Sequence, residues 1–244
     1  MIQAEYYEVE LPGKHQYAPE VKVEIKKITP FEQKKFYSDF LTTETDGDRQ
    51  RVLQNFVKGL VKTTNIEFED IFYPDYTYLL YQIREVTYKL FPLSFAYECD
   101  ECGEKQKVEI NIGELQIESP DEKLPTTILL DNFGEVAIRF KKIKDDEKVE
   151  KFLKSQGENP DDLMMRILAA ELLLLEDWQP LEETWNMAKM GQITLQDTTR
   201  IENFISDNLW GVKEEVNHKC RKCGKEEAVS YNIDPASFFS ANND

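Results

Sequence analysis

The chain has 244 residues, of which 41% are hydrophobic, so it can form one large domain or two small ones with a real core. Its 47 acidic residues exceed its 30 basic residues, and the formal charge of −17 argues against nucleic acid as a main partner, because phosphate binding needs a positive surface. The first residues lack the basic and apolar regions of a signal peptide, and the most apolar segment, 163–175, is too short and too charged to cross a bilayer. We therefore expect a protein made in a reducing cytoplasm, with no membrane partner.

The chain begins with a predicted antiparallel hairpin. Residues 5–10 and 21–28 alternate apolar and polar side chains for most of their length, which is typical of half-buried strands. The hairpin is followed by Thr29-Pro30-Phe31-Glu32, in which Thr29 can cap a helix and Glu32 completes a capping box. This pattern predicts a helix that runs to about Leu41.

Further helices are predicted from apolar residues that recur at helical spacing. In the first half they cover residues 48–60 and 75–90, and the segment 66–71 between them is ambiguous. The second helix leads directly into a cysteine motif. It is rich in tyrosine, which is compatible both with core packing and with a protein interface, where tyrosine is enriched.

All four cysteines lie in two Cys-x-x-Cys-Gly motifs, Cys99-Asp-Glu-Cys102-Gly103 and Cys220-Arg-Lys-Cys223-Gly224. Each motif is flanked by segments with strand-like alternation: 93–98, 107–112, 214–219 and 228–233. Strand, turn and return strand form a zinc knuckle, and two facing knuckles supply the four thiolates that a structural zinc needs. The glycine after each second cysteine suits a backbone with positive φ. Iron or an iron–sulfur cluster is the alternative metal, and disulfides are disfavoured without a sign of secretion.

The second half of the chain has the same order of predicted elements as the first. A strand at 133–143 shares Lys-Lys-Ile with residues 26–28, and the two cysteine hairpins align without a gap. Helices are predicted between these points, at 146–156, 160–175, 180–190 and 195–210. We therefore predict an α+β fold of two duplicated strand–helix–zinc-hairpin units, 1–117 and 128–244, joined by a linker at 118–127.

Duplication has a consequence for the metal, because each unit supplies only one knuckle. The four cysteines are expected to share one Zn²⁺ per chain, on a pseudo-twofold axis between the units. The first knuckle, around Cys99, is acidic, and the second, around Cys220, is basic. Facing each other, the two tips would attract.

Other candidate sites are weak. His218, two residues before Cys220, could replace a cysteine ligand, but a plain strand residue is the simpler interpretation. The carboxylates of Glu67, Glu69 and Asp70 could form an acid–base or metal site, although such runs usually lie on solvated surface. The sequence contains no glycine-rich phosphate loop and no Ser–His–Asp or His-Glu-x-x-His pattern, so we expect neither an enzyme nor a small-molecule substrate.

The sequence resembles a known family, the baseplate hub and hub-assembly proteins of T-even-like contractile-tailed bacteriophages. The resemblance covers residues 9–112 and lies in Leu11-Pro12-Gly13 with Tyr17, Lys26-Lys-Ile-Thr-Pro-Phe-Glu32, Tyr78-Leu-Leu-Tyr-Gln-Ile-Arg84, Thr87-Tyr88 and the cysteine hairpin. The chain departs from the family pattern at Gly13, where serine is usual, at His15, where glycine is usual, and in the order Ile28-Thr29-Pro30.

The resemblance implies a non-enzymatic structural or assembly protein of the tail baseplate, with a zinc-ribbon-like hairpin. Its partners would be other phage tail proteins, and its location the virion after assembly in the host cytoplasm. Two other functions stay open at this stage. A zinc-ribbon adaptor of transcription or translation would need basic knuckle tips, and only the second tip is basic. A redox or iron–sulfur protein would be coloured.

Overall fold

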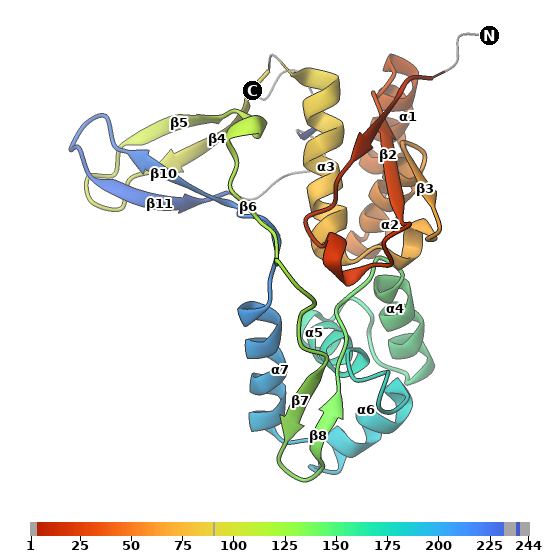
Figure 1. The fold of residues 1–244 in the computed structure, drawn as a ribbon. Helices are drawn as coiled ribbons and strands as arrows, with labels where there is room; N and C mark the ends of the chain where they lie inside the picture. Colours follow the sequence, from red (N-terminus) through yellow and green to blue (C-terminus); the bar gives the residue numbers. More distant parts are fainter. Residues whose placement is uncertain (1–3, 90, 232–237, 240–244) are drawn as a thin grey trace.

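A computed structural model describes residues 4–89, 91–231 and 238–239. Mixed helices and small antiparallel sheets form two layered regions, from which the cysteine hairpins project to one side (Figure 1). This arrangement agrees with the predicted α+β class. In the described residues, no helix has both the length and the apolar character needed to cross a membrane.

The first region combines a three-stranded antiparallel sheet with three helices. Its elements are β1 (Tyr6–Val9), β2 (Lys22–Lys26), α1 (Pro30–Leu41), α2 (Asp46–Lys58), β3 (Val61–Thr64) and α3 (Tyr73–Tyr88), with short 3-10 helices η1 (Lys14–Gln16) and η2 (Phe68–Asp70). The predicted hairpin is β1–β2, with Tyr6 opposite Lys26. The predicted capping box begins α1: Thr29 accepts from the N–H of Glu32, whose side chain accepts from the N–H of Thr29.

The strand β3 was not predicted. It pairs with β2 in the order β1-β2-β3, and its alternation is too short to be distinguished in sequence from the end of the preceding helix. In the β2–β3 pair, Val61 lies opposite Ile25, a fully buried residue of the core. The predicted helix 75–90 begins two residues earlier, at Tyr73, and Leu90 lies outside the described residues.

The second region contains four helices and a short hairpin. Its elements are β7 (Thr127–Leu130), β8 (Gly134–Ala137), α4 (Asp145–Ser155), α5 (Leu163–Leu173), α6 (Leu181–Lys189) and α7 (Leu195–Asp207). The segment expected to be a linker, 118–127, runs from β6 (Ile117–Glu118) to β7, and β6 pairs with β9 (Gly211–Val212).

The single strand predicted over 133–143 is wrong beyond Ala137. After β8 the chain leaves the hairpin, and the N–H of Arg139 donates to Leu174 O at 2.9 Å. The chain then crosses to the first region, where Phe72 and Lys142 form an isolated antiparallel bridge. Ile143 is buried among the core residues of the first region, which draws this segment away from β7.

The buried apolar residues form two clusters. The first contains residues of the sheet and α3 together with Tyr231, Phe238 and Phe239 from the end of the chain. The second lies among α4, α5, α6, α7 and the β7–β8 hairpin. Arg84, which is fully buried on α3, donates to the carbonyl of Phe238 and helps hold the C-terminal residues in the first cluster.

The tyrosines of α3 are divided between core and surface. Tyr76 and Tyr81 are buried in the first cluster, and Tyr78 is partly exposed. On β1, Tyr6 is 38% exposed. Core packing therefore accounts for the most deeply buried members of the set.

Candidate metal centre

Two similar hairpins carry the four cysteines. They are β4 (Leu93–Glu98) with β5 (Lys105–Ile110), and β10 (Glu215–Lys219) with β11 (Glu226–Ser230). Figure 1 shows them side by side, away from the second helical region. The return strands begin two residues earlier than predicted, and Asn232 and Ile233 of the predicted second return strand lie outside the described residues.

The backbone turns of the two hairpins match. The N–H of Gly103 donates to Cys99 O at 2.8 Å, and the N–H of Gly224 donates to Cys220 O at 2.9 Å. The two glycines have φ of 65° and 77°, and an added Cβ would meet nothing within 4 Å at either position. At both positions glycine is therefore required by the positive φ of the backbone and not by crowding.

The sulfurs of Cys99, Cys102, Cys220 and Cys223 all lie within 4.8 Å of one another. Two pairs that join the hairpins, Cys99–Cys223 and Cys102–Cys220, have Sγ–Sγ distances of 3.7 Å. Four thiolates at about 2.3 Å from zinc define a tetrahedron with edges of about 3.8 Å. The donor set and its spacing therefore fit a tetrahedral metal ion, and we call these four residues the cysteine cluster.

The electrostatics of the cysteine cluster favour a cation. The backbone N–H of Cys223 is the main group that lowers the pKa of Cys220, to about 6. The N–H of Glu104 acts in the same direction on Cys102, but burial and the three neighbouring thiols outweigh it and raise the pKa of Cys102 to about 12. The thiol of Cys220 therefore ionises more readily than that of Cys102, and a cation among the sulfurs would stabilise a second thiolate.

Outer contacts hold the two hairpins in register. The side chain of Gln106 on β5 donates to Cys220 Sγ at 3.0 Å and accepts from the N–H of Arg221 at 3.0 Å. Lys222 and Glu104 form an ion pair of 3.0 Å, in agreement with the opposite charges of the two tips. Gln106 was missed by sequence analysis because a glutamine on a strand has no signal that separates it from an ordinary surface residue.

Aromatic contacts continue the pairing away from the sulfurs. Phe95 stacks on Tyr231 with ring centroids 5.5 Å apart, and Tyr97 meets His218 edge-on at 5.3 Å. His218 therefore packs between the hairpins and is not part of the group of ligand atoms found in the described residues.

The carboxylates of η2 serve as ion-pair partners. Glu69 pairs with Lys58, and Asp70 pairs with Lys144 at 2.6 Å and with Lys142 at 3.3 Å. The hydrogen bond from Lys144 is the largest influence on the pKa of Asp70, which is lowered. These contacts hold the segment 141–144 against the first region, as expected for partly solvated surface charges.

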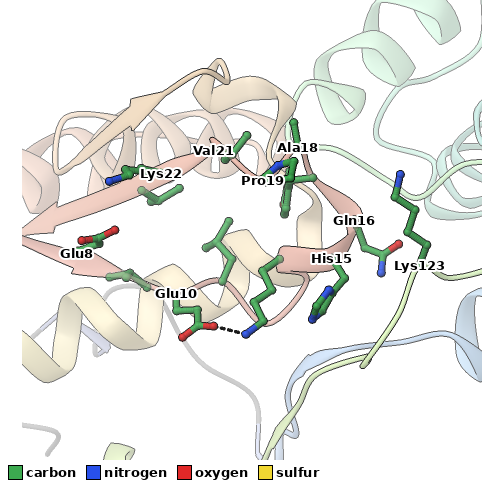
Figure 2. Close-up of a pocket in the computed structure, with 14 residues that line it drawn as sticks. Glu8, Glu10, His15, Gln16, Ala18, Pro19, Val21, Lys22 and Lys123 are labelled. Atoms are coloured by element: carbon green, nitrogen blue, oxygen red, sulfur yellow. Dashed lines mark hydrogen bonds and ion pairs between the residues drawn. The ribbon is translucent and has the colours of Figure 1, made fainter.

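A separate cleft of about 1120 Å³ lies beside the N-terminal hairpin (Figure 2). It is lined by β1, η1 and the start of β2, with Lys123 on its far side. Glu10 and Lys14 form an ion pair at its edge, and Gln16 holds the facing segment by accepting from the N–H of Leu124 at 3.1 Å. The lining charges have both signs, so the cleft has no strong preference for an anion or a cation.

One buried carboxylate was not predicted from the sequence. Asp75 at the start of α3 accepts from the N–H of Gly13 at 2.8 Å, Tyr17 Oη at 2.6 Å and Trp210 Nε1 at 3.1 Å. Burial raises the pKa of Asp75, although the three donors oppose this effect. We call these four residues the Asp75 junction, because Trp210 comes from the second half of the chain.

The sequence was also compared with known proteins. The profile of the family described as "T4 bacteriophage base plate protein" matches residues 4–240, which is nearly the whole chain. No curated protein and no solved structure matches the chain. The match confirms a baseplate family and extends beyond residues 9–112 through the second cysteine hairpin. The chain belongs to the family of T4 bacteriophage base plate proteins.

Proposed function

We propose that this protein is a structural or assembly subunit of a phage tail baseplate, associated with the baseplate hub, and that it acts through protein–protein contacts without catalysis. The family match over residues 4–240 carries the proposal. Its partners are other tail proteins, and it reaches the virion after assembly in the host cytoplasm. The formal charge of −17 supports a partner with a basic surface and keeps the free subunit apart from nucleic acid.

In this proposal, Cys99, Cys102, Cys220 and Cys223 hold one Zn²⁺ per chain. The four sulfurs within 4.8 Å of one another support a shared site, and iron is the less favoured metal. A site with four protein ligands leaves no position for water or substrate, so the metal stabilises the fold and joins the two hairpins.

We also propose that the halves 1–117 and 128–244, with 118–127 between them, descend from one duplicated unit. A repeated contact supports this. Asp75 at the start of α3 accepts from the N–H of Gly13 after β1, and Asp197 at the start of α7 accepts from the N–H of Asp131 after β7, both at 2.8 Å. Each helix is followed by a cysteine hairpin.

The assembly role is tested with a phage that lacks the gene. Without the gene, infectious particles should fall sharply and tails should stop at an incomplete baseplate, and the wild-type gene on a plasmid should restore them. Normal particles without the gene would refute the assembly role. Mass spectrometry of purified virions decides whether the subunit remains in the particle.

The metal is tested on the purified protein. Elemental analysis should find close to one zinc per chain, and the solution should be colourless. Two zincs per chain would mean that the hairpins act separately, and iron with visible absorbance would replace the zinc assignment.

A further inference from the structure

A small apolar hollow lies where the two regions of the molecule meet. Its volume is about 280 Å³, and its walls come from the start of α3, from α5 and from the end of α7. The apolar lining includes Pro74, Phe140, Ile167, Leu174, Leu209 and Trp210. Two of these side chains are unusually accessible for their size: Ile167 is 42% exposed and Leu209 is 59% exposed.

The exposed apolar surface continues along α5 beyond the hollow. Leu163 is 63% exposed and Met164 is 62% exposed, and they lie four and three residues before Ile167. Side chains at these spacings share one face of a helix. The hollow and these two side chains therefore form one apolar strip, which extends about one helical turn along α5 beyond the hollow. Continuous exposed apolar surface of this kind is a feature of protein-binding sites.

An uncompensated acidic pair borders the same hollow. Glu171 lines it, is only 7% exposed and lies beside the carboxyl group of Glu202 on α7. Neither carboxyl group forms an ion pair with any residue in the described parts of the chain. Burial, followed by the charge of Glu202, raises the pKa of Glu171 to about 7.

The lysine that also lines the hollow is already engaged. Lys141 Nζ lies 2.7 Å from Asp146 Oδ1 and 4.1 Å from the centroid of the Tyr73 ring. The hollow thus combines an apolar floor with an acidic pair that no cation in the described part of the chain neutralises. A cationic group placed beside Glu171 and Glu202 would remove their mutual repulsion.

The size of the hollow indicates what kind of group fills it. A hollow of about 280 Å³ lies at the lower end of the range usual for small-molecule sites, about 300–1,000 Å³, and has room for one or two protein side chains. A second copy of this chain is a poor occupant, because it carries the same formal charge of −17. The observations favour a different protein with a basic contact segment.

We propose that the hollow receives a segment of a partner protein that inserts a large apolar side chain beside Leu209 and places a Lys or Arg between Glu171 and Glu202. The proposal deepens, and rests on, the proposed role as a baseplate subunit. Such an anchor would contact both regions of the molecule at once. It would therefore fix their relative position in the assembled tail.

The proposal is tested by complementation of the gene-deleted phage. Leu209→Asp and Glu202→Lys should each lower incorporation into tails by about tenfold or more, as expected for a central anchor contact, with the metal content unchanged and the melting temperature not lowered. Leu195→Asp is the matched control: it lies at the start of α7, is 87% exposed and should assemble normally. Since Glu202 lies on the surface, its variant tests the site without disturbing the core.

A photo-reactive benzophenone amino acid at position 209 identifies the occupant. It should form an adduct with one tail protein, and the cross-linked peptide should contain a Lys or Arg within about one helical turn of the attachment point; position 195 should give no adduct. An adduct between two copies of this chain, or normal assembly of both variants, would overturn the proposal. If the phage needs the gene but Leu209→Asp and Glu202→Lys rescue it fully, only this inference fails; if the phage does not need the gene, the proposed function itself fails.

Discussion

Among the contacts that join the first half of the chain to the second, two differ in kind: the cysteine cluster and the Asp75 junction. In the cysteine cluster, the hairpins meet through four thiols, one glutamine and two aromatic pairs. In the Asp75 junction, a fully buried carboxylate accepts three hydrogen bonds, and the ring of Trp210 packs against Phe72 and Phe140. The first brings together four thiols that fit a metal ion, and the second consists of hydrogen bonds and aromatic packing.

The difference indicates how the halves can be separated. If the cysteine cluster binds a metal ion as proposed, the order of the hairpins depends on the metal concentration. The Asp75 junction contains its own donors and acceptor, so it should keep the two core regions together when the metal is removed. The following changes break one joint at a time.

Loss of a cysteine should have the largest effect. We expect Cys99→Ser to lose the metal and to speed hydrogen exchange of the backbone in 215–219 and 226–230 by about a hundredfold or more, because metal binding free energy is folding free energy here. The indole N–H of Trp210, in the Asp75 junction, should remain protected from hydrogen exchange. Asp100→Ser, at the exposed tip of the same turn, is the control and should keep the metal. Unchanged exchange in the second hairpin of Cys99→Ser would show that the hairpins do not share a site.

The next largest effect is expected at the other joint. Asp75→Ala leaves three donors without their acceptor, and unsatisfied buried groups cost about 1–3 kcal/mol each, so we expect a loss of about 3–5 kcal/mol in the free energy of unfolding. Urea unfolding measures this loss, and zinc content should be retained. Asp177→Ala, at an exposed position, should change stability by less than about 0.5 kcal/mol. A wild-type midpoint for Asp75→Ala would contradict the importance of the junction.

A smaller loss of stability is expected from Gly13→Ala, which tests the close packing of the Asp75 junction. At Gly13, an added Cβ would lie 2.5 Å from Trp210 Nε1 and 2.6 Å from Asp75 Oδ2, so Gly13→Ala should cost about 1–3 kcal/mol in overpacking. At Gly113, an added Cβ would meet nothing within 4 Å, so Gly113→Ala should be neutral or slightly stabilising. Thermal unfolding of the two variants makes the comparison, and equal melting temperatures would mean that the close approach at Gly13 relaxes without cost.

The smallest expected effect is a change in how the free energy of unfolding depends on pH. The pKa of Glu171 is raised to about 7, so between about pH 4.5 and 7 the folded state binds more protons than the unfolded state. This group therefore stabilises the protein fully below about pH 4.5, and its contribution is lost as the pH rises through 7. We expect Glu171→Gln to remove on the order of 1–2 kcal/mol of this pH dependence.

The sign of this effect separates Glu171 from the metal site. Metal binding needs deprotonated thiols, so the stability that it provides falls as the pH falls. Denaturation should be measured from pH 5 to 8 on the metal-loaded protein and on Cys99→Ser, each with and without Glu171→Gln. If Glu171→Gln leaves the slope of the metal-free protein unchanged, the acidic pair is not the source of the pH dependence.

Much of the local structure could be predicted from the sequence because short-range interactions determine it. The capping box of Thr29 and Glu32 begins α1, and helical periodicity located the main helices within a few residues. The Cys-x-x-Cys-Gly pattern located both turns, because the glycine conformation and the N–H groups that face sulfur are contained within a few residues. The opposite charges of the tips were visible as well.

Long-range contacts were decided only by the tertiary structure. The pairing of β3 with β2, the departure of the chain after Ala137 and the insertion of Phe238 and Phe239 into the first core all depend on which distant apolar surface is available. The same is true of Asp75: in the sequence it is an ordinary acidic residue in the first turn of a helix, where an exposed carboxylate is favourable. It became the acceptor of the Asp75 junction because folding brings Gly13, Tyr17 and Trp210 from distant positions to its two oxygens.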